Sequence, residues 1–199
     1  MSEIPVEQHP LEPFLPQHAR LLMLGSFPPP RSKWVMDFFY PNLQNDMWRI
    51  FGLVFKQERD YFVDVEHKTY RLPLLRDFLM QRGIALYDTA SAVRRLQGNA
   101  SDKYLEIVTP TDLSALLSRL PECGVIVTTG QKATDVLCLC FGIAEQPKVG
   151  GFVTFSFEQR SLRLWRMPSS SRAYPMKVER KAEFYDVMFK KVIGQTEQA

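Results

Sequence analysis

Two short apolar runs limit the fold of this chain more than any other part of its sequence. Residues 124–129 read GVIVTT, and residues 20–25 read RLLMLG. Both runs are shorter than a typical helix, and neither alternates apolar with polar residues as a half-exposed strand does. Such runs are typical of strands that are buried on both faces, as in parallel sheets with helices on each side. We therefore expect a layered α/β domain.

Strand and helix patterns alternate along the rest of the sequence. Further strands are expected at residues 84–87, 152–157 and 162–167, and helices at 45–55, 72–82, from about 109 to 120, from 131, and at 177–193. Residues 56–71 are interpreted as an excursion or small hairpin, and residues 88–103 as a long loop. This order predicts a three-layer α/β/α sandwich with a central, mostly parallel sheet. A single domain is expected over residues 20–194, between an irregular surface leader at 1–19 and a tail at 195–199.

Local signals place two of the expected helix ends. Gly83 follows the helix at residues 72–82, in the position where glycine commonly ends a helix. Thr109, Pro110 and Asp112 resemble a helix start, with a hydroxyl cap, a proline in the first turn and a carboxylate at the third position after the cap.

The composition, with 45% hydrophobic and 24% charged residues, is that of an average soluble protein. No apolar run reaches the roughly 18 residues of a membrane span. The N-terminal residues lack the basic and then apolar layout of a secretory signal. We therefore expect a cytoplasmic protein without a membrane partner.

The cysteines do not suit a disulfide framework, because their number is odd and a reducing compartment is expected. They are expected to be buried and inert. The histidines show no ligand-like spacing, so neither a metal nor another cofactor is expected. The residues concerned are Cys123, Cys138 and Cys140, and His9, His18 and His67.

The formal net charge of +3 is too small to indicate nucleic-acid binding by itself. The basic residues are concentrated between positions 160 and 191, where three acidic residues accompany nine basic ones. A solvated surface and a nucleic-acid contact both remain compatible with this pattern. The basic residues are Arg160, Arg163, Arg166, Arg172, Lys177, Arg180, Lys181, Lys190 and Lys191.

Two polar loops directly follow buried strands, so the carboxyl ends of those strands should bring them to one edge of the sheet. The first, GSFPPPRS, is neither a phosphate-binding P-loop nor a dinucleotide fingerprint. The second, PSSSRAY, offers Ser169, Ser170, Ser171 and Arg172, which suit phosphate contacts but equally form a serine-rich turn. A serine-hydrolase site is disfavoured, because no G-x-S-x-G elbow is present and no histidine is placed beside a serine.

Residues 38–48 read FFYPNLQNDMW and combine aromatic rings with two asparagines. Aromatic faces stack on nucleic-acid bases, and amides hydrogen-bond base edges or hold a water molecule. The alternative is that Phe38, Phe39 and Trp48 belong to the core while Asn45 caps the following helix.

Taken in order, these segments resemble the uracil-DNA glycosylase superfamily. The strand and loop L-G-S-F-P match its first motif, the Asn45 segment matches an Asn-x-Phe-Trp pattern, and M-P-S-S-S-R matches its second motif. The resemblance covers residues 20–174 and is strongest to the mismatch-specific uracil and hypoxanthine branches. It implies a monomeric DNA repair enzyme without a cofactor, which flips a deaminated base out of DNA and hydrolyses its N-glycosidic bond.

The resemblance also implies a role for each matching position. Asn45 would hydrogen-bond the base or position the attacking water. Ser26 and Phe27 would line the base pocket, Tyr40 or Phe39 would stack on the base, and Asp88 would contact its edge. Ser169 would contact phosphate with Ser170 beside it, and Ser171 and Arg172 would lie where a wedge enters the base stack.

Two positions depart from the family pattern. Phe27 stands where many relatives have an acidic or amide side chain that prepares water, and Met167 stands where many have histidine or asparagine. Two alternatives therefore stay open, namely a catalytically weakened or inactive DNA-binding relative and a hydrolase of free nucleosides or nucleotides.

Overall fold

A five-stranded sheet lies at the centre of the protein, in a computed structural model that describes residues 4–97 and 102–193. Its order is β5 (Ile84–Asp88), β2 (Leu21–Gly25), β8 (Val125–Thr129), β10 (Arg160–Met167) and β9 (Phe152–Phe157). The first four strands run parallel, and β9 joins the edge antiparallel to β10. The expected mostly parallel sheet is confirmed.

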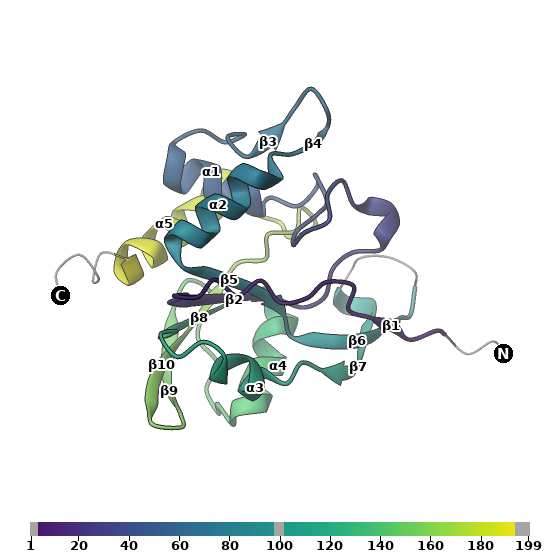
Figure 1. Cartoon of the computed structure of the whole chain (residues 1–199). Helices are drawn as coiled ribbons and strands as arrows, with labels where there is room; N and C mark the ends of the chain where they lie inside the picture. The colour runs from purple at the N-terminus through teal and green to yellow at the C-terminus, as the bar shows by residue number, and fades with distance from the viewer. Residues whose placement is uncertain (1–3, 98–101, 194–199) are drawn as a thin grey trace.

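Helices cover both faces of this sheet (Figure 1). The helices α1 (Met47–Lys56), α2 (Leu72–Arg82) and α5 (Val178–Ile193) lie on one face, and α3 (Leu113–Ser118) and α4 (Gln131–Phe141) lie on the other. In β2, Leu21 and Met23 join the core under the first group, whereas Leu22 and Leu24 join the core under the second. Because successive strand side chains point to opposite faces, an unbroken apolar run supplies both cores, and the three-layer sandwich is confirmed.

The long loop expected over residues 88–103 is wrong in part, since β6 (Ala90–Arg95) lies within it. In a second, antiparallel sheet, β6 pairs with β7 (Leu105–Pro110) and with β1 (Glu7–Gln8). The sequence of β6, ASAVRR, has small and basic residues in place of a clear strand signal, and its register to β7 is irregular. Residues 98–101 of the expected loop lie outside the described part of the chain.

The expected helix start at Thr109 is also wrong. Thr109 and Pro110 end β7, an outer strand of its sheet, where the missing N–H of a proline is tolerated. The helix α3 begins at Leu113, and the Asp112 carboxylate accepts a hydrogen bond from the Ala115 N–H at 2.9 Å. The expected end of α2 at Gly83 is confirmed, and β3 (Val63–Asp64) and β4 (Thr69–Tyr70) form the expected hairpin.

The leader contains more structure than its composition indicates. Besides β1, Phe14 exchanges two backbone hydrogen bonds with Leu86 of the central sheet, at 3.0 and 2.9 Å. The expectation of an irregular segment is therefore wrong at Glu7, Gln8 and Phe14, while residues 1–3 and the tail at 195–199 lie outside the described part.

One of the three cysteines differs from the expectation that all are buried. Cys123 and Cys138 are buried as expected, but Cys140 is exposed, because two residues of separation turn it to the other side of α4.

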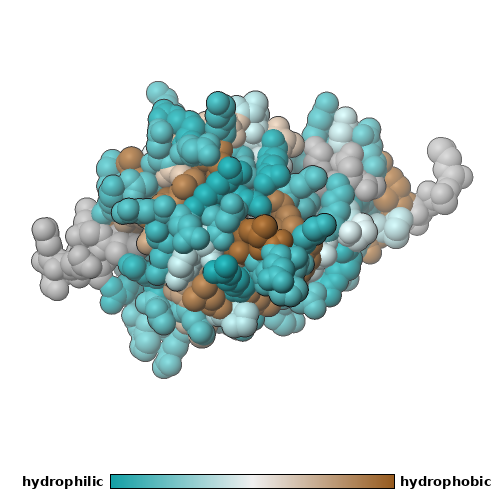
Figure 2. All heavy atoms as spheres, turned by 90° about the horizontal axis from the view of Figure 1, so that it is seen from above, coloured by the Kyte–Doolittle hydropathy of each residue, from teal (hydrophilic) through white to brown (hydrophobic). Residues whose placement is uncertain are grey.

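Figure 2 shows hydrophilic residues over most of the face above α1 and α2, with apolar residues in smaller areas between them. None of the helices within the described residues has the length and apolar character needed to cross a membrane.

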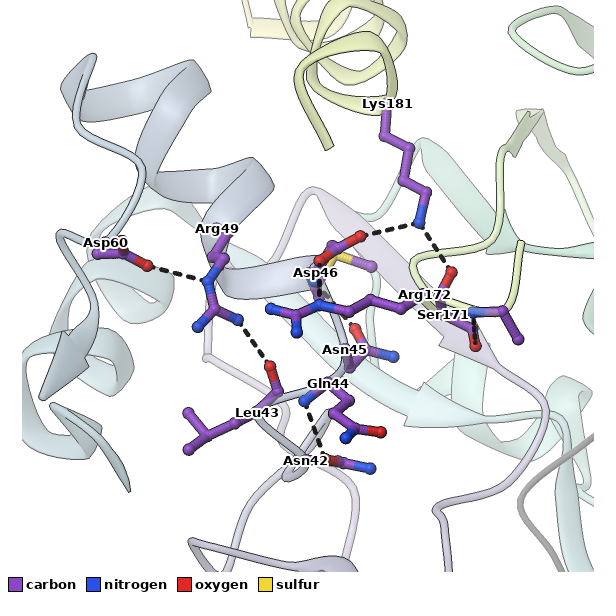
Figure 3. Close-up of polar contacts among 12 residues, drawn as sticks. Asn42, Leu43, Gln44, Asn45, Asp46, Arg49, Asp60, Ser171, Arg172 and Lys181 are labelled. Carbon is purple, nitrogen blue, oxygen red and sulfur yellow. Dashed lines mark hydrogen bonds and ion pairs between the residues drawn. The ribbon is translucent and has the colours of Figure 1, made fainter. Parts of the chain in front are cut away.

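A buried cluster of charges, the Asp46 cluster, ties α5 to the rest of the fold (Figure 3). The Lys181 ammonium is fully buried and donates to Asp46 Oδ2 at 2.9 Å and to the Ser171 carbonyl at 2.8 Å. Arg172 Nε donates to Asp46 Oδ1 at 3.1 Å. The members Asp46, Arg172 and Lys181 come from the start of α1, the loop after β10, and α5, so one carboxylate joins three distant segments.

Lys181→Met should lower the free energy of unfolding by about 3 kcal/mol, because breaking a buried ion pair leaves a desolvated charge. Lys190→Met is the matched control, since Lys190 pairs with Asp186 on the exposed side of the same helix. Loss of this exposed ion pair should lower the free energy of unfolding by less than about 1 kcal/mol. Urea unfolding measures both, and equal losses would contradict the role given to Lys181.

Candidate functional site

A cleft of about 640 Å³ opens at the carboxyl ends of the parallel strands. The loop after β2 and the loop after β10 both line it, which confirms that the two loops reach the same edge of the sheet. Its other lining residues come from within 39–45 and 129–135, together with Asp88, Asp102, Lys103 and Val149.

Asn45 lines the cleft, and the two atoms of its amide have different surroundings. Its Oδ1 accepts a hydrogen bond from the Met47 N–H at 2.9 Å, which supports the start of α1. Because only the oxygen of an amide can accept from an N–H, this bond fixes which atom is which. Nδ2 has no hydrogen-bond partner among the described residues, and it can therefore donate to a bound molecule. The N-cap of α1 is Asp46, so Asn45 supports the helix from the position before the cap while it lines the cleft.

The aromatic residues after the first loop divide between core and cleft. Phe39 is 3% exposed and packs edge-on against Phe38 and Tyr87, so it belongs to the core as well as to the cleft wall. Tyr40 is half-buried and adopts a left-handed backbone conformation with φ of 50°, which is uncommon for a residue with a side chain. Its hydroxyl lies 3.5 Å from Thr129 Oγ1.

Tyr40 keeps its proton at any ordinary pH. Burial, and then the negative charge of Asp88, raise the pKa of the Tyr40 phenol well above its usual value. A neutral phenol can donate one hydrogen bond and accept others, so Tyr40 brings a donor to the floor of the cleft.

Asp88 ends β5 beside Gly25 and Tyr40 and lines the cleft. Its Oδ2 lies 2.9 Å from Nε2 of His9, a residue of the leader. A Cβ on Gly25 would stand 2.5 Å from Asp88 Oδ1 and 3.6 Å from the Tyr40 hydroxyl. The absence of a side chain at Gly25 therefore leaves room for a carboxylate oxygen and a phenol hydroxyl to converge.

A second carboxyl group, that of Asp102, also lines the cleft. The Ser26 hydroxyl donates to Asp102 Oδ1 at 2.6 Å, and both residues line the cleft. Burial raises the pKa of Asp102 above its ordinary value, while the Ser26 hydrogen bond and the charge of Lys132 oppose that rise. The hydrogen of the Ser26 hydroxyl is thus used by Asp102, and the hydroxyl oxygen remains able to accept a hydrogen bond.

Phe27 and Met167 offer no polar group to the cleft, as their sequence indicates. Met167 is fully buried. The Phe27 ring meets the His9 ring edge-on at 5.2 Å between centroids, and the Arg95 guanidinium lies over it at 5.5 Å. Phe27 therefore packs on the residue that binds Asp88.

The serine loop is held mainly by its own backbone and by the Asp46 cluster. The Asp46 N–H donates to the Ser170 carbonyl at 2.8 Å, and the Ser171 N–H donates to Ser169 Oγ at 3.2 Å. Ser170 is 3% exposed, whereas Ser169 and Ser171 are half-buried at the cleft. The Arg172 side chain is 45% exposed and uses Nε for Asp46, with no further hydrogen bond among the described residues. Its terminal nitrogens are free to meet an anion.

The structure brings together most of the residues that the sequence singles out. All of them line the cleft except Arg172, which lies next to it. Four other residues were not expected, namely His9, Asp46, Asp102 and Lys181. No local sequence pattern indicates His9 or Lys181. Asp46 does have a local signal, because it is a single acidic residue between Asn45 and an apolar helix.

Within the described residues, no group of three or more His, Cys, Asp or Glu side chains is placed to hold a metal ion. The chemistry that this cleft offers from its own side chains is hydrogen bonding and charge.

Comparison with known proteins finds solved structures of similar fold. No protein-family model and no curated protein sequence matches the chain. A solution NMR structure from Methanosarcina acetivorans, provisionally named a uracil DNA glycosylase, is similar to it with a TM-score of 0.61 and 22% sequence identity. The match covers 94% of this chain and 99% of the other. The two proteins share a fold from end to end.

Gly25→Ala should destabilise the fold by about 1–3 kcal/mol, because the new methyl group must displace a carboxylate that His9 holds in place. Gly124→Ala is the control, since nothing lies within 4 Å of a Cβ at that position. Thermal or urea unfolding compares the two variants. Equally small losses of stability in Gly25→Ala and Gly124→Ala would show that the Asp88 side chain moves freely.

Asp102 should make stability fall as the pH rises. Since its pKa is raised in the folded state, the folded protein binds more protons than the unfolded chain between the ordinary carboxyl pKa of about 3.9 and the raised value. Over that interval, wild type should lose stability relative to Asp102→Asn, and above it the difference should stay constant. Urea unfolding of both proteins between about pH 3.5 and 7 tests this. The prediction would be contradicted if the stability difference between wild type and Asp102→Asn did not change with pH, or if it moved in favour of wild type as the pH rose.

Proposed function

We propose that this protein is a DNA glycosylase that removes a deaminated base, uracil or hypoxanthine, from DNA. The observation that carries the proposal is the set of hydrogen-bonding groups at the floor of the cleft, where Asp88 supplies an acceptor and Tyr40 a donor side by side. The shared fold with the Methanosarcina acetivorans protein supports it.

The acceptor and donor match what deamination changes on a base. Cytosine and adenine present a ring nitrogen acceptor beside an amino donor, whereas uracil and hypoxanthine present a ring N–H beside a carbonyl. Asp88 Oδ1 can accept from that N–H, and the Tyr40 hydroxyl can donate to the carbonyl. Thymine and guanine carry the same pair of groups, so their exclusion must come from the shape of the cleft around the methyl and amino groups.

Asn45 would assist the departure of the base. The base leaves with negative charge, and its oxygens gain strength as acceptors in the transition state, so a fixed donor there lowers the barrier. The Asn45 Nδ2 is such a donor, because its Oδ1 is held by the Met47 N–H. An amide cannot remove a proton from water, which suits a base that is already easy to expel.

The rim around Arg172 favours DNA over a free nucleoside as substrate. The Asp46 cluster contains two cations and one anion, so it places a surplus positive charge beside Ser169 and Ser171. Hydroxyls, backbone N–H groups and an arginine with free nitrogens are the groups that commonly contact phosphate.

One observation favours a weaker second candidate, a relative that binds DNA without cutting it. Phe27 and Met167 deny the cleft the polar groups that the resembling family keeps at these positions. Salt-sensitive DNA binding without base release would indicate this candidate. Activity on free deoxyuridine or deoxyinosine, without DNA affinity, would indicate a nucleoside hydrolase.

The proposal is tested with oligonucleotides that carry one deoxyuridine or deoxyinosine, as single strands, matched duplexes and mismatches, with alkaline cleavage of abasic sites as the readout. Wild type should release at least one of the two bases and should leave cytosine and adenine at the same position intact. Release of neither base on any of these substrates would overturn the proposal.

Asn45→Ala should lower the single-turnover rate by about a hundredfold, as loss of a transition-state donor does. Asn45→Asp separates two roles, because it keeps the oxygen that accepts from Met47 and replaces the donor by a charged acceptor. A donor role predicts a similar loss in Asn45→Asp. A rate equal to or above that of wild type would instead assign Asn45 to orienting water.

A further inference from the structure

His9 reaches the cleft floor from a segment far away in the sequence. Its Nε2 lies 2.9 Å from Asp88 Oδ2, and the two side chains are only 2% and 9% exposed. The ring is enclosed by Phe27, Tyr87 and Phe39, with centroid distances of 5.2, 4.7 and 6.3 Å. A histidine in such a place is buried together with its only acidic partner among the described residues.

The carboxylate beside Nε2 requires a hydrogen on that nitrogen, because an ionised carboxylate can only accept, and Nδ1 can adapt to either state of the ring. Nδ1 faces the Leu11 N–H at 3.2 Å and the Leu11 carbonyl at 3.0 Å. In a neutral ring Nδ1 accepts from that N–H, and in a charged ring it donates to that carbonyl. In both states Nε2 carries a hydrogen, which it donates to Asp88.

This bond leaves Asp88 with one free oxygen in a fixed direction. Oδ2 is engaged by His9, whereas Oδ1 has no hydrogen-bond partner among the described residues and stands beside Gly25 and Tyr40. A bare carboxylate beside a departing anionic base would raise the barrier, since like charges repel. The His9 N–H draws negative charge toward Oδ2 and away from the base.

We propose that His9 is a positioning residue that holds Asp88 as the reader of the base edge, so that the N-terminal segment forms part of the active site. The inference rests on the proposed function, from which it takes the role of Asp88. The strand β1 delivers His9, because Glu7 and Gln8 pair with β6 and the His9 N–H donates to the Ser91 carbonyl at 2.8 Å. Glu7 also binds Arg95, at 3.0 Å.

The experiment compares wild type with His9→Leu, which removes the donor, and with His9→Gln, whose amide nitrogen can take the place of Nε2. Single-turnover base release should fall about tenfold in His9→Leu and less than about threefold in His9→Gln, because a hydrogen bond to a charged group is lost in the first alone. His18→Leu is the control, since His18 also pairs with a carboxylate, Glu122, but on the exposed surface. Circular dichroism checks that each variant is folded.

A positioning role further requires that His9 act through Asp88. In an Asp88→Ala background, His9→Leu should change the rate by less than about twofold, which a double-mutant cycle measures. An unchanged rate in His9→Leu would overturn the proposal. So would a loss of the same size with and without Asp88, because it would show a purely structural role.

Binding of free uracil and hypoxanthine, followed by NMR titration of the same proteins, separates this inference from the proposed hydrolysis. Wild type that binds a base but cleaves no oligonucleotide would overturn hydrolysis, and the His9 role would stand if His9→Leu weakens that binding about tenfold and His9→Gln does not. Equal affinities in wild type and His9→Leu, or no binding of either base to wild type, would overturn the His9 role.

Discussion

The carboxylate of Asp46 is the constraint on which the geometry of the cleft depends. It is 6% exposed at its side chain, and it binds the buried Lys181 with one oxygen and Arg172 with the other. Removing such charges from water costs several kcal/mol per ion, so the cluster adds little net stability compared with an apolar core. What it adds is a unique arrangement, because any displacement of α1, the serine loop or α5 leaves one of these charges buried without its partner.

The backbone of Asp46 extends this constraint to the candidate catalytic residue. Its N–H donates to the Ser170 carbonyl at 2.8 Å, and the preceding residue, Asn45, forms a bridge with Ser171. The backbone of Asn45 is therefore held beside the serine loop, and its amide oxygen is held by the Met47 N–H. The Asp46 cluster carries a surplus positive charge beside the serine loop, while Asp88 and Asp102 bring carboxyl groups to the lining of the cleft. A phosphate and the N–H edge of a base would each find its complement there.

The sequence predicts the layers and the edge of the sheet where ligands bind, but not the contacts that complete the cleft. Buried strands such as β2 and β8 are visible because their apolar runs are local and serve two cores at once. The partners His9 and Asp88 are 79 residues apart, Ser26 and Asp102 are 76 apart, and Asp46 and Lys181 are 135 apart. Polar pairs at such separations leave no periodic signal. The same is true of β6, where pairing with β1 and β7 overrides a weak strand propensity.

Phe27 and His9 are best understood as one feature of the cleft. As a single position, Phe27 is a departure, because an apolar ring stands where many members of the family that the sequence resembles have a polar side chain. In the structure that ring forms one wall around His9, and Arg95 closes over its other side at 5.5 Å. Excluding water from His9 strengthens the hydrogen bond that it gives to Asp88, since the local dielectric falls. A polar side chain at position 27 would admit water to this bond and compete for it. In the proposed site, Asp88 would supply the polar group that the first loop lacks, and the Phe27 ring would shield the histidine that holds it.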